Sequence, residues 1–422
     1  MADTALPRTD AAARAATSPV SEARRNELMR AYPTAFDLRR RSRRRMPNFA
    51  FEYGDGGAGS DGGIARNWAA LDAVELMPRY GKVIAPPSAQ TTILGRSYSA
   101  PIGISPVGGP GTCFPGAEHY LAAAAQAARV PYTLGVLSGI TVEQAARIAP
   151  DVLWFQLYRF SNNNHKIGLD LVARADAAGV QALVLTFDTP TRTTRPRETK
   201  SGIPHPFRLT MQMRLDALSS PPWLMSLARH GIPRFVSVAP YMGGPRSLEE
   251  TAAWIRREQG GAFTWDELAR YRDAWKNKPL VLKGVLHPQD AERAVKLGID
   301  GLFVTNHGGR QIDALPASID ALPAVARAVG GKAAIILDSG VRSGVDAARA
   351  VALGADAGFA GKAFLWSLGA LGPEGPAHLI NIMTEDVRAT MGQTGCNTVA
   401  ELRHVPVRHP GVWRPEEYAS RG

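Results

Sequence analysis

Three stretches of the chain repeat one another, and their spacing restricts the possible fold more than any other feature. Residues 294–303 (AVKLGIDGLF) and 350–359 (AVALGADAGF) are near copies, and residues 175–184 (ADAAGVQALV) keep the pattern. Each indicates a helix end, a glycine that terminates it, a short loop and a new buried strand. Repeated units of this kind predict an α/β protein with parallel strands.

Short apolar segments recur at this rhythm from Ala100 onward, separated mostly by amphipathic helical patterns. The eight expected strands are Ile102–Pro106, Tyr132–Leu137, Trp154–Tyr158, Leu183–Asp188, Leu280–Lys283, Gly301–Thr305, Ala334–Asp338 and Gly358–Gly361. Eight units favour a (β/α)8 TIM barrel over a doubly wound sheet, because polar residues end nearly every strand.

The remaining segments surround this barrel. We expect a mobile arm over residues 1–30, an N-terminal helical and capping segment over 31–100, the barrel over 101–402 and a C-terminal tail over 403–422. Six arginines between Arg39 and Arg45 indicate either a patch for anionic lipid or nucleic acid, or the solvated face of a helix over 33–45. The second interpretation is favoured, and we expect no nucleic-acid partner.

A long insertion, about 189–275, follows the fourth expected strand and is rich in Pro, Arg and Met. A segment in this position lies over the face of a barrel that carries the active site. Its centre, residues 221–233 (PPWLMSLARHGIP), is apolar with flanking cations. It could be a lid, a monotopic membrane contact, or a loop packed on its own barrel or on a neighbouring subunit, and the last is favoured.

Cysteine usage and hydropathy restrict the cellular compartments in which the protein is expected. The two cysteines, Cys113 and Cys396, cannot form a disulfide framework or a cysteine-rich metal site, and lone thiols suit a reducing compartment. The sequence shows neither an apolar run long enough to span a bilayer nor a signal-peptide apolar region at its start. We expect a cytoplasmic location, with peripheral contact at the inner face of the membrane as the alternative.

Polar residues and small residues gather at the carboxyl ends of the expected strands, where a barrel holds its ligand. In chain order they are Pro106, Val107, Gly108, Gly135, Gln156, Tyr158, Thr186, Asp188, Lys283, Asn306, His307, Arg310, Asp338, Gly340, Arg342, Gly361 and Lys362. Buried polar groups need partners, so this mouth predicts a polar ligand.

The ends of the last two strands predict a phosphate site. Gly340 and Gly361 let backbone N–H groups approach an anion, and Arg342 and Lys362 supply charge. Ordinary helix capping is the structural alternative.

Other strand ends suit the rest of a phosphorylated cofactor. Lys283 ends an apolar strand, where it could form a Schiff base or stabilise a developing anion. Gln156 and Thr186 offer hydrogen bonds to a heterocycle edge. These residues favour a cofactor such as FMN or PLP, whereas a dinucleotide is disfavoured because no GxGxxG motif opens a helix.

Residues 304–311 (VTNHGGRQ) carry the candidate catalytic base. His307 needs an orienting partner, and Asp188 ends a different strand where it could hold the imidazole. Arg310 and Arg195 could grip a carboxylate. Two tyrosines, Tyr53 and Tyr158, could hydrogen-bond a substrate, or they could be half-buried packing residues.

At these residues the chain resembles the FMN-dependent L-2-hydroxy acid oxidising family. The family includes glycolate oxidase, lactate oxidase, lactate monooxygenase and the membrane-associated lactate and mandelate dehydrogenases. The similarity runs from about Pro33 to Leu402. The motifs that carry it are FEY (51–53), FQLY (155–158), LTFDTP (185–190), RPR (195–197), LKG (282–284), TNHGGRQ (305–311), LDSGVR (337–342) and ALG (352–354).

The resemblance implies the same roles. His307 would be the base on the substrate 2-hydroxyl, Asp188 its partner, and Arg195 and Arg310 the carboxylate clamp. Tyr53 and Tyr158 would contact substrate, and Lys283 would lie beside the flavin N1/C2 oxygen. A homotetramer, and oxygen or a quinone or another carrier as electron acceptor, are implied in the same way.

Four positions depart from the family or discriminate within it. Gly135 replaces a Ser or Thr that meets the flavin ring, and Lys362 replaces an Arg at the phosphate. Leu137 stands where glycolate oxidase has Trp, which opens room for a larger substrate. Gly108 replaces an Ala of the oxidases, as in the mandelate dehydrogenase. The insertion, with Trp223, also resembles that of the mandelate dehydrogenase.

The sequence therefore predicts FMN-dependent oxidation of an L-2-hydroxy acid, such as lactate, mandelate or a larger analogue, to the 2-oxo acid. The departures favour a dehydrogenase over an oxidase. The alternatives are decarboxylating oxidation of the lactate 2-monooxygenase type, a non-oxidising FMN barrel enzyme such as an isomerase, and a flavin-binding protein that has lost catalysis.

Overall fold

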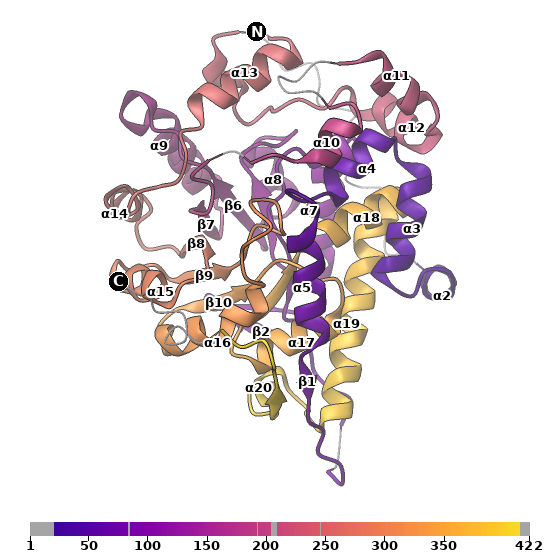
Figure 1. Ribbon diagram of the computed structural model, residues 1–422, viewed down its shortest axis with the longest axis vertical. Coiled ribbons are helices and arrows are strands. Elements are labelled where there is room, and N and C mark those ends of the chain that lie inside the picture. Colours follow the sequence, from indigo (N-terminus) through magenta and orange to yellow (C-terminus); the bar gives the residue numbers. More distant parts are fainter. Residues whose placement is uncertain (1–20, 83–84, 192, 204–208, 245, 414–422) are drawn as a thin grey trace.

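Eight parallel strands close into a barrel in the computed structural model, which describes residues 21–413 except 83–84, 192, 204–208 and 245 (Figure 1). The barrel strands are β4 (Ile102–Ile104), β5 (Tyr132–Gly135), β6 (Leu153–Leu157), β7 (Ala182–Thr186), β8 (Leu280–Val285), β9 (Gly301–Val304), β10 (Ala334–Leu337) and β11 (Ala357–Ala360). The barrel closes where Gly358 of β11 pairs with Ile102 of β4. The expected barrel is confirmed, and the doubly wound alternative is wrong.

Helices follow the strands and form an outer layer. They are α7 (Ala117–Ala128), α8 (Val142–Ile148), α9 (Asn162–Ala177), α14 (Trp265–Ala274), α15 (Pro288–Lys296), α16 (Ser318–Val329), α17 (Gly344–Ala352), α18 (Lys362–Leu371) and α19 (Gly375–Thr394). The glycines of the repeated pattern end three of them: Gly179, Gly298 and Gly354 have φ of 77°, 81° and 106°. Residues with side chains rarely adopt this conformation, which explains why glycine recurs there.

Aromatic side chains fill the barrel interior. Trp154, Phe303 and Phe359 are buried, and their ring centroids lie 5.2–6.3 Å apart. Gly103 of β4 is needed beside them, because a Cβ there would lie 2.4 Å from the Phe359 ring. A ligand can therefore reach the barrel only at its mouth, above these rings.

The N-terminal segment packs beside the barrel as α2 (Glu22–Ala31), α3 (Ala35–Arg45), α4 (Asn48–Asp55) and α5 (Gly62–Asp72) (Figure 1). Residues 22–30 of the segment expected as a mobile arm are helical. Helix α2 begins at Glu22, and Arg24 fastens it to Glu374 through two hydrogen bonds of 3.1 and 2.8 Å. Residues 1–20 lie outside the described part of the chain.

The arginine cluster on α3 is more than a solvated face. Arg39 binds Asp55 at 2.6 and 2.8 Å, Arg41 donates to the Ala370 carbonyl at 2.8 Å, and Arg43 binds Glu52 at 3.1 Å. These side chains fix α3 to α4 and to the end of α18, although Arg43, like Arg40 and Arg44, is exposed. Part of the positive charge of α3 therefore forms ion pairs and hydrogen bonds within the protein.

Small strands complete the scaffold. The hairpin of β2 (Thr91–Ile93) and β3 (Arg96–Tyr98) lies in the expected capping segment, with Leu94 against the start of β9. In the expected tail, β12 (Val407–Arg408) pairs with β1 (Glu75–Leu76), and residues 414–422 lie outside the described residues.

The insertion lies over the barrel mouth as α10 (Pro196–Lys200), α11 (Met211–Leu218), α12 (Pro221–His230), η1 (Ala239–Met242) and α13 (Leu248–Glu258) (Figure 1). It ends before α14, which is the barrel helix that precedes β8, rather than near residue 275. Within the described residues, no helix has both the length and the apolar character to cross a bilayer.

Two contacts fix the insertion to its own chain. Arg197 of α10 reaches three carboxylates of the N-terminal segment: Asp55 and Asp61 at 2.7 Å each, and Glu52. On α12, the Ser226 hydroxyl donates to the Pro115 carbonyl at 2.7 Å. Packing on its own barrel, the favoured interpretation, describes this part of the insertion.

Candidate active site

The loop after β9 presents His307 at the barrel mouth. The Thr305 hydroxyl accepts a hydrogen bond from the His307 N–H at 3.0 Å. The Ser339 hydroxyl, from the loop after β10, accepts from the N–H groups of Asn306 and Gly308 at 3.2 and 2.8 Å. His307 has a φ of 61°, in the left-handed region, so this tight loop is held by side-chain hydroxyls rather than by regular secondary structure.

Asp188 orients the His307 ring. Its two carboxylate oxygens lie 3.0 and 3.1 Å from His307 Nδ1, and Gln311 donates to the Asp188 carbonyl at 2.6 Å. Burial lowers the pKa of His307 below its ordinary value, although the Asp188 charge opposes this shift. Nδ1 is engaged, so a neutral ring offers Nε2 to the cavity as a base.

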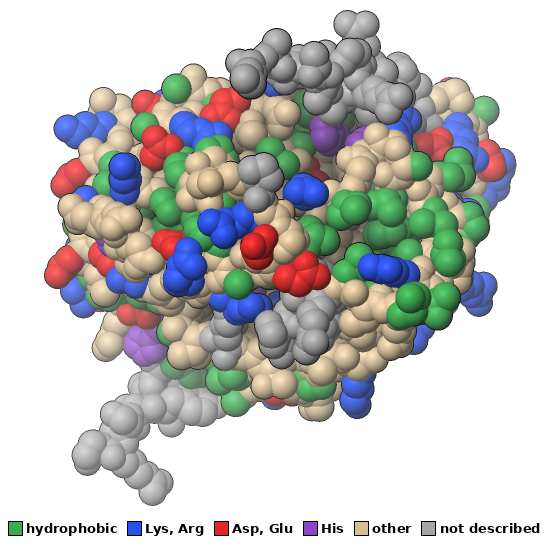
Figure 2. Space-filling model, turned by 90° about the horizontal axis from the view of Figure 1, so that it is seen from above, with side chains coloured by type: hydrophobic (Ala, Val, Ile, Leu, Met, Phe, Trp, Pro, Cys, Tyr) green, Lys and Arg blue, Asp and Glu red, His purple; other side chains and the backbone are tan. Residues whose placement is uncertain are grey.

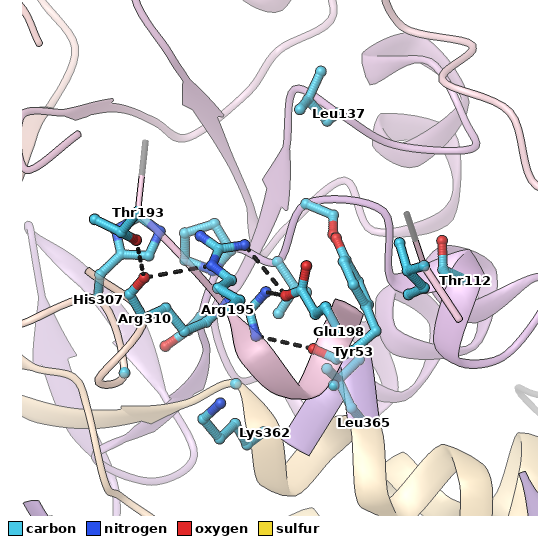
Figure 3. Close-up of a pocket in the computed structure, with 18 of the residues that line it drawn as sticks. Tyr53, Thr112, Leu137, Thr193, Arg195, Glu198, His307, Arg310, Lys362 and Leu365 are labelled. Carbon is cyan, nitrogen blue, oxygen red and sulfur yellow. Dashed lines mark hydrogen bonds and ion pairs between the residues drawn. The ribbon is translucent and has the colours of Figure 1, made fainter. Parts of the chain in front are cut away.

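The two expected clamp arginines lie together (Figure 3). The Arg195 Nε donates to the Arg310 carbonyl at 3.4 Å, and both guanidiniums contact one oxygen of Glu198, Arg310 at 2.7 Å and Arg195 at 3.4 Å. The side chains of Arg195 and Arg310 are 28% and 17% exposed. They therefore offer positive charge in a poorly solvated place, where it attracts a carboxylate strongly.

The expected substrate contacts also meet here. Tyr53 donates its hydroxyl to the Gly108 carbonyl at 2.6 Å, and its ring lies 5.4 Å from the Arg310 guanidinium carbon. Tyr158 and Leu137 line the same cavity. Burial raises the pKa of the Tyr158 hydroxyl, so it remains a donor at neutral pH.

Lys283 lines the same cavity as His307. Its Nζ is 3.6 Å from Asp338 Oδ2. Burial disfavours its charge, but the charges of Asp188 and Asp338 raise the pKa of Lys283 above its ordinary value. A lysine that stays charged is a poor Schiff-base nucleophile and a good partner for a developing anion.

The residues expected to bind a phosphate lie near the start of α18. A Cβ at Gly361 would lie in ordinary contact, at 3.6 Å, with the side chains of Ser105 and Val107. Arg342 is held by Asp346 at 3.4 Å, and Lys362 donates to the carbonyls of Asp55 and Gly56 at 3.2 and 2.6 Å. Together with Gly340, these residues line the cavity beside a helix N-terminus, which fits a phosphate.

The remaining expected cofactor residues divide into two groups. Pro106, Val107, Gly108 and Asp338 line the cavity. Gln156 and Thr186 are buried at neighbouring strand ends and bind each other at 2.7 Å, and they are not among the lining side chains.

The structure explains why residue 135 is a glycine. A Cβ there would lie 2.9 Å from the Val107 carbonyl oxygen, so the loop after β4 packs where a serine or threonine side chain would begin.

Most of these groups border one cavity of about 1300 Å³, whose lining includes Lys283 and residues of the insertion. That volume exceeds the roughly 300–1,000 Å³ of an ordinary ligand pocket, so it can hold a cofactor and a substrate together. Its insertion side is lined largely by apolar residues, namely Ile203, Leu209, Met213, Ala217, Trp223, Leu227, Ile232, Phe235, Leu248 and Ile255.

Two site residues were missed from sequence. Asn67 of α5 and Asn306 exchange amide hydrogen bonds of 2.9 and 2.8 Å, which ties the catalytic loop to the N-terminal segment. Glu198 was missed because it lies in the insertion, although its spacing from Arg195 was a usable signal.

Comparison with known proteins agrees with this geometry. A family model described as FMN-dependent dehydrogenase matches residues 42–409. The chain belongs to this family. The resemblance seen in the motifs is confirmed, and with it an oxidoreductase that uses FMN.

Individual relatives are similar over most of the chain. An L-lactate dehydrogenase of Pectobacterium atrosepticum is 37% identical over 367 residues, which are 87% of this chain and 94% of the relative. The structure of the monotopic membrane protein (S)-mandelate dehydrogenase matches with a TM-score of 0.83 and 31% identity, covering 89% of this chain and 99% of that one. Mandelate oxidase with (S)-2-phenylpropionate matches with a TM-score of 0.76 and 31% identity, covering 90% and 100%.

Proposed function

We propose that this flavoenzyme oxidises an L-2-hydroxy acid with an apolar side chain to the 2-oxo acid, with His307 as the base. The observation that carries the proposal is the His307–Asp188 pair, which faces a cavity that also holds Arg195 and Arg310. A base beside a pair of carboxylate-binding cations suits a substrate with a hydroxyl next to its carboxylate.

Each side chain has a role in this reaction. When bound, FMN supplies the two-electron oxidant. His307 Nε2 takes the proton of the 2-hydroxyl, and Asp188 stabilises the imidazolium that results. Arg195 and Arg310 hold the carboxylate, and Tyr53 and Tyr158 orient the substrate. Lys283 balances negative charge on the cofactor side.

The cavity supports an apolar substrate side chain. Leu137 lines it together with Leu227, Ile232 and Phe235 of the insertion. Lactate and mandelate are the first substrates to test, and mandelate fills more of this apolar space.

Anaerobic reduction of the flavin tests the proposal. L-Lactate or L-mandelate should bleach the yellow holoenzyme without oxygen and yield the 2-oxo acid in equal amount. If no 2-hydroxy acid bleaches the flavin, the proposal is wrong and a non-oxidising barrel enzyme takes its place. Release of carbon dioxide with oxygen uptake would instead indicate decarboxylating oxidation.

An apolar surface on the insertion supports peripheral membrane contact. Met211, Leu215, Leu218, Met225 and Ile232, on and beside α11 and α12, are 55–74% exposed, and Figure 2 shows a continuous apolar area on the right of the molecule. Exposed cations lie at 214, 229 and 234 in the same segments. An apolar face bordered by cations binds the interface of an anionic membrane.

Cosedimentation with vesicles of anionic and neutral phospholipid tests this contact. The holoenzyme should pellet with anionic vesicles, and Leu218→Asp with Met225→Asp should release it without loss of flavin reduction. If the double variant changes the sedimentation coefficient of the free protein instead, the surface is a contact between subunits.

The electron acceptor is a further proposal from this arrangement, and the homotetramer is a further proposal from the family resemblance. A membrane-bound enzyme of this class would pass electrons to a quinone or another carrier rather than to oxygen. Reoxidation of the bleached enzyme should be faster with a quinone analogue than in air. The homotetramer is tested by analytical ultracentrifugation.

A further inference from the structure

Glu198 is a buried carboxylate inside the substrate clamp. Its side chain is 5% exposed, and one of its oxygens, Oε1, accepts hydrogen bonds from both Arg310 and Arg195 (Figure 3). It comes from α10, a five-residue helix at the start of the insertion. A carboxylate buried at this depth is retained only with charged partners, and here the partners are the two substrate arginines.

The hydrogen bonds of Arg310 show how Glu198 acts. Arg310 Nη1 donates to the carbonyls of Tyr53 and Gly56 at 2.9 Å each, and Nη2 donates to Glu198 at 2.7 Å. Three of its five N–H groups are therefore directed at the protein. Arg310 is fixed in position, with limited capacity left for an incoming carboxylate.

Arg195 is engaged less strongly. Its contacts with the Arg310 carbonyl and with Glu198 are both 3.4 Å. Its Nη2 makes no hydrogen bond within the described residues, so this guanidinium can turn toward a carboxylate in the cavity. The charge count of the clamp is two guanidiniums and one carboxylate, which leaves one positive charge in excess.

We propose that Glu198 is a positioning residue that sets both the geometry and the net charge of the clamp, so that the site selects a monocarboxylate. This inference rests on the proposed function, since it concerns the same substrate site. A second carboxylate on the ligand would meet no second excess positive charge within the clamp, and Glu198 would repel it at short range. Substrates of the malate or tartronate kind would be rejected for this reason.

Replacement of Glu198 by Gln separates charge from shape. The amide oxygen of E198Q can still accept from Arg310, so packing and one hydrogen bond remain while the negative charge is lost. A purely structural role would leave the preference between ligand charges unchanged. A charge-setting role would shift that preference toward dianions.

The experiment measures binding to the holoenzyme by isothermal titration calorimetry, with propionate as the monoanion and malonate as the dianion. Neither has a hydroxyl next to its carboxylate, so neither is turned over. We expect the ratio of the malonate to the propionate affinity to rise roughly tenfold or more in E198Q, the size expected for one unit charge at short range in a poorly solvated site. E198D keeps the charge and should keep the wild-type ratio.

A matched control removes a different ion pair. Glu143 binds Arg174 at 2.7 and 3.0 Å on the outer helices, and E143Q should leave the ratio unchanged. An unchanged ratio in E198Q overturns the inference, and so does a rise in E198D if E198Q does not fold. A shifted ratio in a protein whose flavin no hydroxy acid reduces would retain the clamp and reject the proposed reaction.

Discussion

Replacement of Asp188 by Asn tests the proposed base most directly. The variant keeps the size of the side chain and removes the negative charge that lies 3.0–3.1 Å from His307 Nδ1. In the wild-type protein burial disfavours the Asp188 charge, but His307 and Lys283 lower the pKa of Asp188 below its ordinary value. The carboxylate is therefore ionised at neutral pH and available to stabilise an imidazolium.

The expected loss follows from Coulomb's law. With charge centres about 4 Å apart and an effective dielectric constant of about 20, the pair is worth about 4 kcal/mol. Since about 1.4 kcal/mol corresponds to a tenfold change in rate, D188N should reduce the flavin about a thousandfold more slowly. The loss comes from the step in which His307 becomes charged.

Anaerobic stopped-flow absorbance with L-mandelate measures this rate on protein with full FMN content. The pH profile adds a second readout, because His307 must be neutral to act. Without the Asp188 charge the pKa of His307 falls further, so the acid limb of the D188N profile should move to lower pH. Asp176→Asn, which removes an exposed partner of Lys278, is the control and should reduce flavin at the wild-type rate.

Either of two results would refute the reasoning. A D188N rate within tenfold of the wild type would show that the pair does not stabilise the reacting state. An acid limb that moves to higher pH would show that the titrating group is not His307.

Three further predictions concern the cofactor, the substrate and the fold. Burial lowers the pKa of Lys362 to about 7, so the apoprotein should bind FMN less tightly as pH rises from 6 to 9, and K362R should remove that part of the dependence in a fluorescence titration. Leu137→Trp should raise KM for mandelate at least about tenfold while lactate is less affected, which steady-state kinetics would measure. A Cβ at Gly344 would lie 1.9 Å from the Met383 carbonyl oxygen, so G344A should cost about 3 kcal/mol in urea unfolding, whereas G392A, with its nearest neighbour at 3.9 Å, should not destabilise.

The barrel and most strand-end residues were predictable because they follow a local pattern. Glycine after a helix, an apolar run and a polar strand end recur along the chain, and parallel strands bring such ends together. This placed His307, Asp188 and Lys283 around one mouth before any contact was known.

Long-range pairing was not predictable in this way. The sequence pattern predicts a solvated face for the α3 arginines because their carboxylate partners lie on other elements. Arg39, for example, binds Asp55 of α4. The sequence does not reveal the contact that holds helix α2, because Arg24 and its partner Glu374 are 350 residues apart. Glu198 belongs to a segment without periodicity, so its spacing from Arg195 is the only sequence signal, and its contacts with Arg195 and Arg310 identify its place in the site.

Arg197 joins the insertion to the N-terminal segment, so the two segments act as one structural unit. Its guanidinium joins α10 to Glu52, Asp55 and Asp61, so the two segments evolve under a shared constraint although the first four barrel strands separate them in sequence. A chimera that takes the insertion from a protein without an arginine at position 197 would leave three acidic side chains without their common partner. Recombination of substrate pockets within this family should therefore succeed when both segments are transferred together.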